Sequence, residues 1–267
     1  MSRQASWQRT EPAALWSFVV PVKLTAQAKT RLAGDLSPQE RAELARAMVV
    51  DTVAAARAAQ AVHQVVVVTD DHDVVADLRG VPSVGWAPLV VVPEPVPAAG
   101  LNAAVRAGVG AARGDVRAPG RQTAGATTGP VAVLLGDLPA LRPEDLDQAL
   151  VAASAFPRAV VVDAEGTGTT LLTASARVLL EPAFGPGSAD EHLRRGHVRL
   201  DVPDLSGLRQ DVDRLDDLAA VARLGAGRAT AQVLARRGQS AVPQADDERP
   251  TAAPEGESRA DEAAAVA

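Results

Sequence analysis

The chain has no cysteine and few aromatic residues: three Trp, three Phe and no Tyr among 267 residues. The absence of cysteine excludes disulfide bonds, thiolate zinc sites and cysteine nucleophiles. So few rings argue against single-stranded nucleic-acid binding by base stacking. No apolar run reaches the roughly 18 residues of a membrane-spanning helix, and the polar residues 1–15 lack the apolar segment of a secretory signal. We therefore expect a cytoplasmic protein without a membrane or nucleic-acid partner.

Charge and composition divide the chain into segments. The net charge is −6, and residues 238–267 hold seven acidic residues, two arginines and scarcely any large apolar side chain. This composition predicts a disordered acidic tail. Residues 1–15 are interpreted as a flexible N-terminus, and residues 16–237 are long enough for one domain with a substantial core. Within that domain, the Gly-, Thr- and Pro-rich residues 114–130 predict a mobile surface insertion.

Short apolar runs alternate with longer periodic segments along the domain. Ser37, Pro38 and Glu40 form a helix start, with a capping serine, proline at the first helical position and glutamate three residues after the cap. The expected strands are residues 16–21, 63–69, 88–92, 131–135, 159–162 and 169–173. The expected helices are residues 38–60, 71–79, 100–113, 143–154, 188–195 and 216–224. This alternation predicts an α/β fold whose mostly parallel sheet is covered by helices on both faces.

Lysine is almost absent, and its placement is informative. The chain has 27 Lys and Arg residues together, but lysine occurs only at Lys23 and Lys29, in VPVKLTAQAKTRLAG after the first expected strand. With Arg31, they place three cations where open α/β sheets bind ligands. Lysine is a compact charge suited to phosphate oxygens, so this loop is a candidate polyphosphate site. From this loop alone, three solvated surface charges are an equally good interpretation, and the P-loop pattern is absent.

Three aspartates form a candidate metal site. Asp137 follows the apolar run VAVLL in the segment GDLP, where a carboxylate at a strand end faces the ligand crevice. Asp211 and Asp213 alternate with Val212, so in an extended segment both carboxylates project to the same side. Like charges at this spacing favour a cation between them, and hard oxygen ligands suit Mg²⁺ bound to phosphates. The alternative is a turn aspartate and a solvated pair before a helix.

Two late segments combine glycine with hydroxyl side chains: GTGTT at residues 166–170 and FGPGS at residues 184–188. Ser188 is a candidate helix N-cap, which would leave backbone N–H groups for an anion, although ordinary turns have the same composition. The four histidines show no metal-ligand spacing, and no Ser/His/Asp arrangement is present. If the nucleophile is itself a phosphate, no general base is required, and catalysis reduces to positioning and charge neutralisation.

Six segments taken in order resemble one family: VPVKLTAQAKTRLAG, GLNAA, LLGDLPAL, DAEGTGTTLL, FGPGSADEH and LRQDVDRLDDL. They resemble the 2-phospho-L-lactate / phosphoenolpyruvate guanylyltransferases of coenzyme F420 biosynthesis, whose fold is similar to that of molybdopterin guanylyltransferases. The resemblance implies a three-layer α/β/α, Rossmann-like nucleotidyltransferase. It also implies that GMP is transferred from GTP to a phosphorylated three-carbon acid, with release of pyrophosphate.

The resemblance also implies residue roles on the nucleotide side. Lys23, Lys29 and Arg31 would hold the GTP phosphates. Gly100 and Asn102 would lie near the nucleotide. Lys23, Lys29 and Asp137 would be the catalytic residues.

On the metal and acceptor side, Asp137, Asp211 and Asp213 would bind Mg²⁺. The acceptor's phosphate and carboxylate would be bound by three further residues, Thr170, Gly185 and Ser188. Phosphoenolpyruvate is preferred as acceptor because the Ala-, Arg- and Val-rich, lysine-poor composition resembles that of the high-G+C actinobacterial branch. The resemblance further implies that the product passes to the next enzyme of F420 biosynthesis. It leaves open whether the chain forms a homodimer and how guanine is selected.

Other functions remain open from sequence. A nucleotidyltransferase for a sugar phosphate or a molybdopterin usually has an L-A-G-G loop, where this chain has V-P-V-K. A nucleotide-sugar glycosyltransferase needs a D-x-D motif, whose second carboxylate would stand at Pro139. A non-catalytic nucleotide-binding regulator would tolerate loss of the metal carboxylates, and all three are present.

Overall fold

A seven-stranded sheet runs through the part of the chain that the computed structural model describes: residues 15–23, 25, 29–82, 86–95, 100–114 and 129–240, without the side chains of residues 238–240. The strands are β1 (Trp16–Pro21), β2 (Val62–Val68), β3 (Leu89–Val92), β4 (Val131–Leu134), β5 (Arg158–Val162), β6 (Thr169–Ala174) and β7 (Val198–Arg199). Their order is β3-β2-β1-β4-β6-β5-β7. Only β6 runs antiparallel to its neighbours β4 and β5, so the expected mostly parallel sheet is confirmed.

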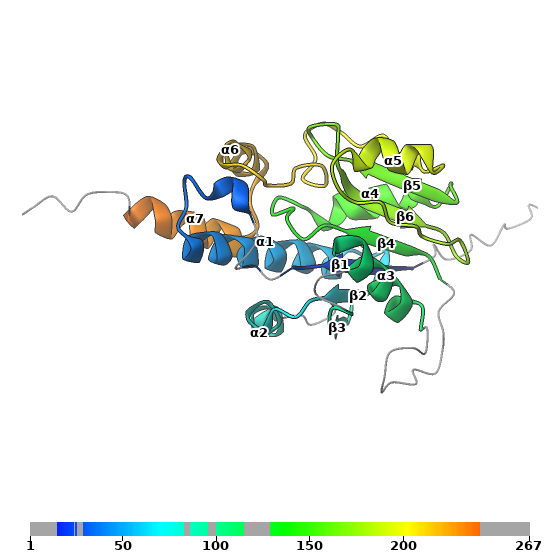
Figure 1. Cartoon of the computed structure of the whole chain (residues 1–267), viewed down its shortest axis with the longest axis horizontal. Helices are drawn as coiled ribbons and strands as arrows, with labels where there is room; N and C mark the ends of the chain where they lie inside the picture. The colour runs from blue at the N-terminus through cyan, green and yellow to red at the C-terminus, as the bar shows by residue number, and fades with distance from the viewer. Residues whose placement is uncertain are drawn as a thin grey trace, which may run out of the picture.

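Helices pack on both faces of this sheet (Figure 1). They are α1 (Pro38–Ala58), α2 (His72–Gly80), α3 (Leu101–Ala112), α4 (Pro143–Ala153), α5 (Ser188–Arg194), α6 (Leu215–Leu224) and α7 (Arg228–Ser240), with a short 3₁₀ helix at Thr30–Leu32. Apolar residues of α1, α2 and α4 form one core cluster with one side of the strands. Residues of α3 form a second cluster with the other side. This is the expected three-layer α/β/α arrangement. None of the helices that the structure describes combines the length and apolar character needed to cross a bilayer.

Local sequence signals fix the first long helix. The Glu40 N–H donates to Ser37 Oγ at 3.3 Å, and the Ser37 N–H donates to Glu40 Oε2 at 2.8 Å, which is the reciprocal capping box expected from the sequence. Further along α1, the Thr52 hydroxyl accepts the N–H of Leu138 at 3.1 Å in the fully buried core. The helix therefore holds the loop that follows β4.

Three elements were not expected: the 3₁₀ helix, the two-residue β7 and α7. The carboxylate of Asp51 in α1 accepts the N–H groups of Ala229 at 2.9 Å and Thr230 at 2.7 Å, and so caps the start of α7. This helix continues to Ser240, and so includes the first three residues of the expected tail, 238–240. Residues 241–267, residues 1–14 and most of the expected insertion at 114–130 lie outside the described residues.

Candidate active site

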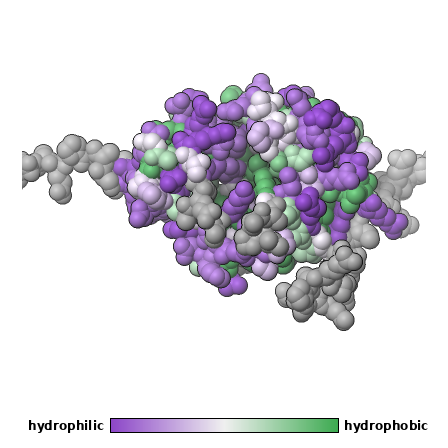
Figure 2. Space-filling view, in the orientation of Figure 1, coloured by the Kyte–Doolittle hydropathy of each residue, from purple (hydrophilic) through white to green (hydrophobic). Residues whose placement is uncertain are grey.

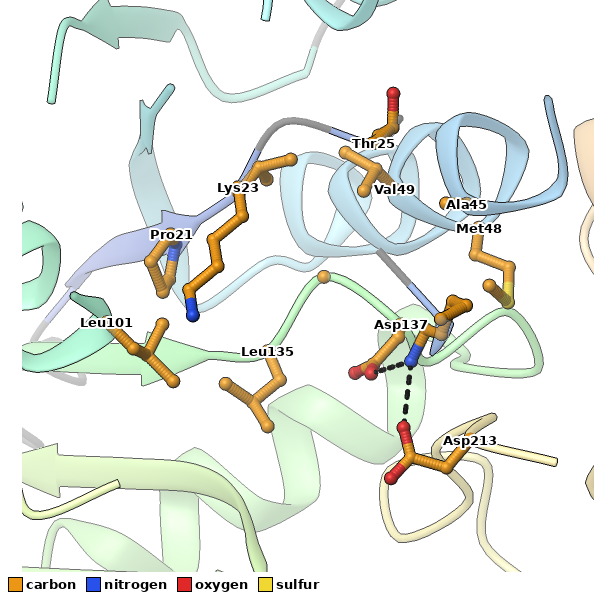
Figure 3. Close-up of a pocket in the computed structure, with 13 residues that line it drawn as sticks. Pro21, Lys23, Thr25, Ala45, Met48, Val49, Leu101, Leu135, Asp137 and Asp213 are labelled. Atoms are coloured by element: carbon orange, nitrogen blue, oxygen red, sulfur yellow. Dashed lines mark hydrogen bonds and ion pairs between the residues drawn. The ribbon is translucent and has the colours of Figure 1, made fainter. Parts of the chain in front are cut away.

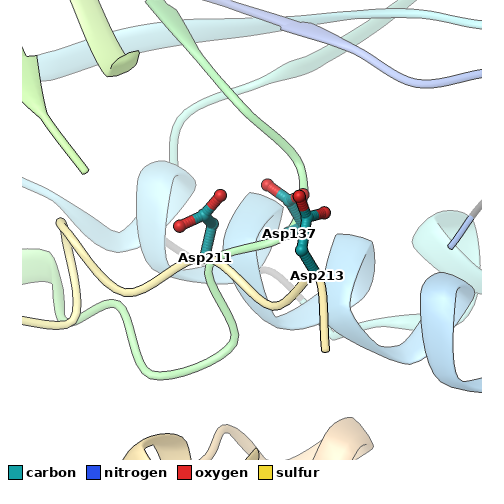
Figure 4. Close-up of side chains that lie close together, drawn as sticks. All are labelled: Asp137, Asp211 and Asp213. Carbon is teal, nitrogen blue, oxygen red and sulfur yellow. The ribbon is translucent and has the colours of Figure 1, made fainter. Parts of the chain in front are cut away.

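The three predicted metal carboxylates lie together at the carboxyl end of β4 (Figure 4). Asp137 follows that strand, and its carbonyl oxygen accepts the N–H of Val212 at 3.2 Å. Val212 is fully buried in an apolar cluster with residues of α1, so Asp211 and Asp213 on either side face away from that cluster. Oxygens from the three carboxylates lie within 4.8 Å of one another. One cation can therefore contact all three.

This carboxylate cluster is electrostatically strained. Burial, followed by the nearby charges of Asp137, Asp163 and Asp213, raises the pKa of Asp211 from 3.8 to about 7. Asp137 Oδ1 is buried and has no hydrogen-bond partner among the residues that the structure describes. An unpaired buried carboxylate oxygen is costly. Both features would be relieved by a bound cation.

Lys29 and Arg31 approach the same carboxylates. Lys29 Nζ donates to Asp137 and, at 3.2 Å, to Asp213 Oδ1 (Figure 3). Arg31 donates to the other oxygen of Asp213 at 2.8 Å. The Lys29 side chain is only 10% exposed. Burial alone would lower its pKa, but the two aspartates raise it above the usual lysine value. Lys29 is therefore charged at neutral pH.

The Lys29 backbone adopts a left-handed conformation, with φ 56° and ψ 43°, immediately before the 3₁₀ helix. This conformation costs a residue with a Cβ on the order of 1–2 kcal/mol, and such strain persists where the surroundings determine it. In this conformation the Lys29 side chain forms ion pairs with Asp137 and Asp213.

A cavity of about 380 Å³ lies on the β1 side of the carboxylates. Lys23 lies at its edge just after β1, and in Figure 3 its ammonium group lies on the side of Pro21, Leu101 and Leu135. Asp71 holds this loop, because its carboxylate accepts both the N–H and the hydroxyl of Thr25, at 2.8 and 2.6 Å. Figure 2 draws the molecule in the orientation of Figure 1. It shows a hollow near the middle of the visible face, with hydrophobic residues at its floor and mostly hydrophilic residues around it.

A second cavity of about 350 Å³ shares Leu135 and Asp213 with the first. Arg31 and Asp211 also line it. One wall is the turn before β6, in which the Asp163 carboxylate accepts the N–H groups of Thr167 and Gly168 at 2.9 and 2.7 Å. A Cβ at position 168 would lie 2.2 Å from Asp163 Oδ2, so any larger residue there would displace the Asp163 carboxylate from the two N–H groups. Asp163 was not predicted from the sequence, although it stands four residues before the Thr-Gly pair whose N–H groups it binds.

The predicted acceptor residues divide into two groups. Gly185 and Ser188 line the second cavity. Gly187, with φ 71°, is the N-cap of α5, so the expectation that Ser188 is the cap was wrong by one residue. The Thr170 hydroxyl is fully buried and has no partner in the described part of the chain, and its neighbour Thr169 lines the cavity instead.

The predicted nucleotide residues at the start of α3 also have different surroundings. Gly100 is the N-cap of α3, with φ 78°. The Asn102 amide is paired with the backbone of Phe184: it donates to the carbonyl at 3.0 Å and accepts the N–H at 2.8 Å. Asn102 therefore ties α3 to the loop of the second cavity, while Leu101 lines the first cavity.

The fold and the site together define a nucleotidyltransferase: acidic and basic side chains at the carboxyl end of a mostly parallel sheet, between two adjoining cavities. The family model described as "Guanylyl transferase CofC like" matches residues 16–111. The phosphoenolpyruvate guanylyltransferase of Sanguibacter keddieii is 59% identical over 248 residues, covering 83% of this chain and 84% of that protein. The chain therefore belongs to the phosphoenolpyruvate guanylyltransferase family, which confirms the resemblance.

Further comparisons agree. The phosphoenolpyruvate guanylyltransferase of Streptomyces scabiei is 48% identical over 221 residues, covering 83% of this chain and 96% of that protein. A crystal structure assigned as a nucleotide-diphospho-sugar transferase from Desulfovibrio desulfuricans superposes with a TM-score of 0.59 at 17% identity, covering 84% of this chain and 95% of that one. At this identity the structural likeness concerns the fold alone.

Proposed function

We propose that this protein transfers GMP from GTP to phosphoenolpyruvate and releases pyrophosphate, the step that the family resemblance assigns to coenzyme F420 biosynthesis. The observation that carries the proposal is the meeting of two cavities at one cluster of three carboxylates, Asp137, Asp211 and Asp213. Two anionic substrates and a cation fit such an arrangement. The relatives named phosphoenolpyruvate guanylyltransferase support the choice of substrates.

The carboxylates fit Mg²⁺, because they offer hard oxygen ligands and one of them, Asp137, has a buried oxygen without a partner. When bound there, Mg²⁺ would neutralise charge on the phosphates of the substrates. Lys23 and Lys29 line the first cavity, which we assign to GTP, and supply positive charge to its triphosphate. Arg31, which the resemblance placed on the GTP phosphates, lines the second cavity and not the first. We assign that second cavity to the acceptor, so Arg31 would contact GTP only where the two substrates meet.

In the reaction, an oxygen of the acceptor's phosphate attacks the α-phosphorus of GTP. One P–O bond forms and the bond to the β-phosphate oxygen breaks, so pyrophosphate leaves with the electron pair. The nucleophile is already anionic, so the chain needs no general base, and its residues act by positioning and by neutralising charge.

The test is a pyrophosphate-release assay with each nucleoside triphosphate and a panel of acceptors: phosphoenolpyruvate, 2-phospho-L-lactate and a sugar 1-phosphate. We expect pyrophosphate release only when GTP is combined with a three-carbon acid, either phosphoenolpyruvate or 2-phospho-L-lactate. In competition at equal concentration, the guanylated products differ by two hydrogens in mass, and we expect phosphoenolpyruvate to predominate. Release with the sugar phosphate alone would contradict the proposal.

The Asp137→Asn variant provides the matching mutational test. We expect pyrophosphate release to fall by at least about 100-fold, because the metal loses an anionic ligand whose oxygen is otherwise unpaired. Circular dichroism should show an intact fold. Retention of wild-type turnover at limiting Mg²⁺ would contradict the metal assignment.

A further inference from the structure

The peptide group that follows Asp137 is held at both of its ends by parts of the chain that are distant in sequence. Its carbonyl oxygen, which belongs to Asp137, accepts the N–H of Val212 at 3.2 Å. Its N–H, which belongs to Leu138, donates to Thr52 Oγ1 at 3.1 Å. The first bond connects Asp137 to the segment that carries the other two carboxylates. The second connects it to α1, and the reaction as described so far gives Thr52 no role.

The Thr52 hydroxyl is oriented for this contact. Its side chain is fully buried, and its hydrogen is donated to the Met48 carbonyl, one turn earlier in α1, at 2.8 Å. The oxygen is therefore left as an acceptor for the Leu138 N–H. The Leu138 side chain is also fully buried, in the core cluster that includes α1. Its N–H and its side chain together hold the residue directly after Asp137 in place.

The residue before Asp137 lies against the same helix. A Cβ at position 136 would lie 3.3 Å from Cγ2 of Val49 in α1, which is closer than the optimal separation of two carbon atoms. The backbone on both sides of Asp137 is thus placed relative to α1. Because a peptide group is planar, turning the one after Asp137 would break its bonds to Thr52 and Val212 and would redirect the Asp137 side chain.

We propose that Thr52 is a positioning residue for the metal site: it fixes the peptide group after Asp137 and, through it, the direction of the Asp137 carboxylate toward the cation. The inference rests on the proposed function, because that function assigns a cation to the three carboxylates around Asp137. Thr52 lines neither of the two cavities, so it acts through the backbone and not on the substrates. Groups that orient a metal ligand determine metal affinity without contacting the metal.

The first experiment measures Mg²⁺ binding to Thr52→Val in the absence of substrates. Valine keeps the shape of threonine and removes the acceptor, so the buried Leu138 N–H loses its partner. The dependence of the melting temperature on Mg²⁺ concentration gives the dissociation constant. We expect this constant to rise by about 10-fold or more, as for other groups that orient a metal ligand.

Three further variants separate positioning from stability. Thr52→Ser and Thr52→Ala both lose the methyl group and differ only in the hydroxyl, so Mg²⁺ should bind more weakly to Thr52→Ala than to Thr52→Ser. This pair also decides the question if Thr52→Val does not fold. Thr173→Val is the matched control, because it removes an equally buried hydroxyl that donates to the Ala159 carbonyl at 3.3 Å. It should lower the melting temperature and leave the Mg²⁺ dissociation constant unchanged.

The second experiment is pyrophosphate release at increasing Mg²⁺ concentration with saturating substrates. In Thr52→Val, the Mg²⁺ concentration that gives half of the maximal rate should rise together with the dissociation constant. At saturating Mg²⁺, KM for GTP should stay close to the wild-type value, because Thr52 does not line the cavity assigned to GTP. In Thr173→Val, neither quantity should change.

The outcomes are distinguishable. If wild-type protein releases no pyrophosphate with GTP and either three-carbon acid, the proposed function is wrong. If wild type is active without Mg²⁺, the metal assignment is wrong and the inference fails with it. If wild type needs Mg²⁺ and Thr52→Val lowers only the melting temperature, Thr52 is structural and the inference is overturned. Equal Mg²⁺ affinities of Thr52→Ser and Thr52→Ala would overturn it as well.

Discussion

Replacing Asp211 by asparagine should make the metal-free protein more stable at pH 8 while it weakens metal binding. Burial and three neighbouring carboxylates raise the pKa of Asp211 from 3.8 to about 7. In the unfolded chain this carboxyl ionises near its ordinary value. Above pH 7 it is therefore ionised in both states, and its charge is held at a cost only in the folded protein. Asparagine removes that charge and keeps the size of the side chain.

The magnitude follows from linkage. The folded state holds the proton more tightly than the unfolded state, so stability falls as pH rises from about 4 to about 7 and is constant above that range. The shift corresponds to at most about 4 kcal/mol. Water entering the open cavity reduces this, so we expect a gain of at least about 1 kcal/mol at pH 8, or about 2–4 °C in melting temperature for a domain of this size.

The assay is thermal unfolding followed by circular dichroism in EDTA at pH 8 and pH 4.5. The difference between Asp211→Asn and wild type should be largest at pH 8 and nearly absent at pH 4.5. Asp213→Asn is the matched control: Asp213 forms ion pairs with Lys29 and Arg31, so its loss should not stabilise the protein. Added Mg²⁺ should raise the melting temperature of wild type more than that of Asp211→Asn. A melting temperature of Asp211→Asn at or below wild type at pH 8 would refute the reasoning.

Three further predictions concern other parts of the structure. Lys29→Arg should lower turnover in the pyrophosphate assay, because a guanidinium does not fit where the ammonium lies almost fully buried between two carboxylates; wild-type turnover would contradict this. Gly168→Ala should raise KM for the acceptor, since its Cβ would meet Asp163 at 2.2 Å, whereas Gly34→Ala, with open space, should not. Asp51→Ala should lower the unfolding free energy by about 1–2 kcal/mol through loss of the α7 cap and leave both KM values unchanged.

Local signals predicted the elements that carry them. The apolar run WSFVVP predicted β1 at its observed bounds, and Ser37 with Glu40 predicted the start of α1, because a capping box is a contact between near neighbours in sequence. The helix α7 was missed because it is mostly polar and its cap, Asp51, lies 178 residues before Ala229. A contact at that separation leaves no periodic pattern in the segment itself.

The candidate site shows the same division. Asp137, Asp211 and Asp213 were predicted together because strand ends and alternation place carboxylates at one edge of a parallel sheet. The choice between Thr169 and Thr170 could not be made from sequence. Both residues lie at the start of β6, opposite a register irregularity between Val161 and Val162, and an irregularity of this kind cannot be located from the sequence.

The site combines several unfavourable features within a few residues. Lys29 has left-handed backbone geometry, Asp211 is held among like charges, and an oxygen of Asp137 is buried without a partner. Each of these features lowers the stability of the fold, so stability does not explain why they occur together. A cation would satisfy the carboxylates, and the triphosphate would then receive the ammonium group that now pairs with them. Because Lys29 and a cation would compete for Asp137 and Asp213, binding of the cation would favour release of Lys29 toward the triphosphate, and by linkage the triphosphate would favour the cation equally. The strain in this site is therefore the physical reason to expect that metal and nucleotide bind to it cooperatively.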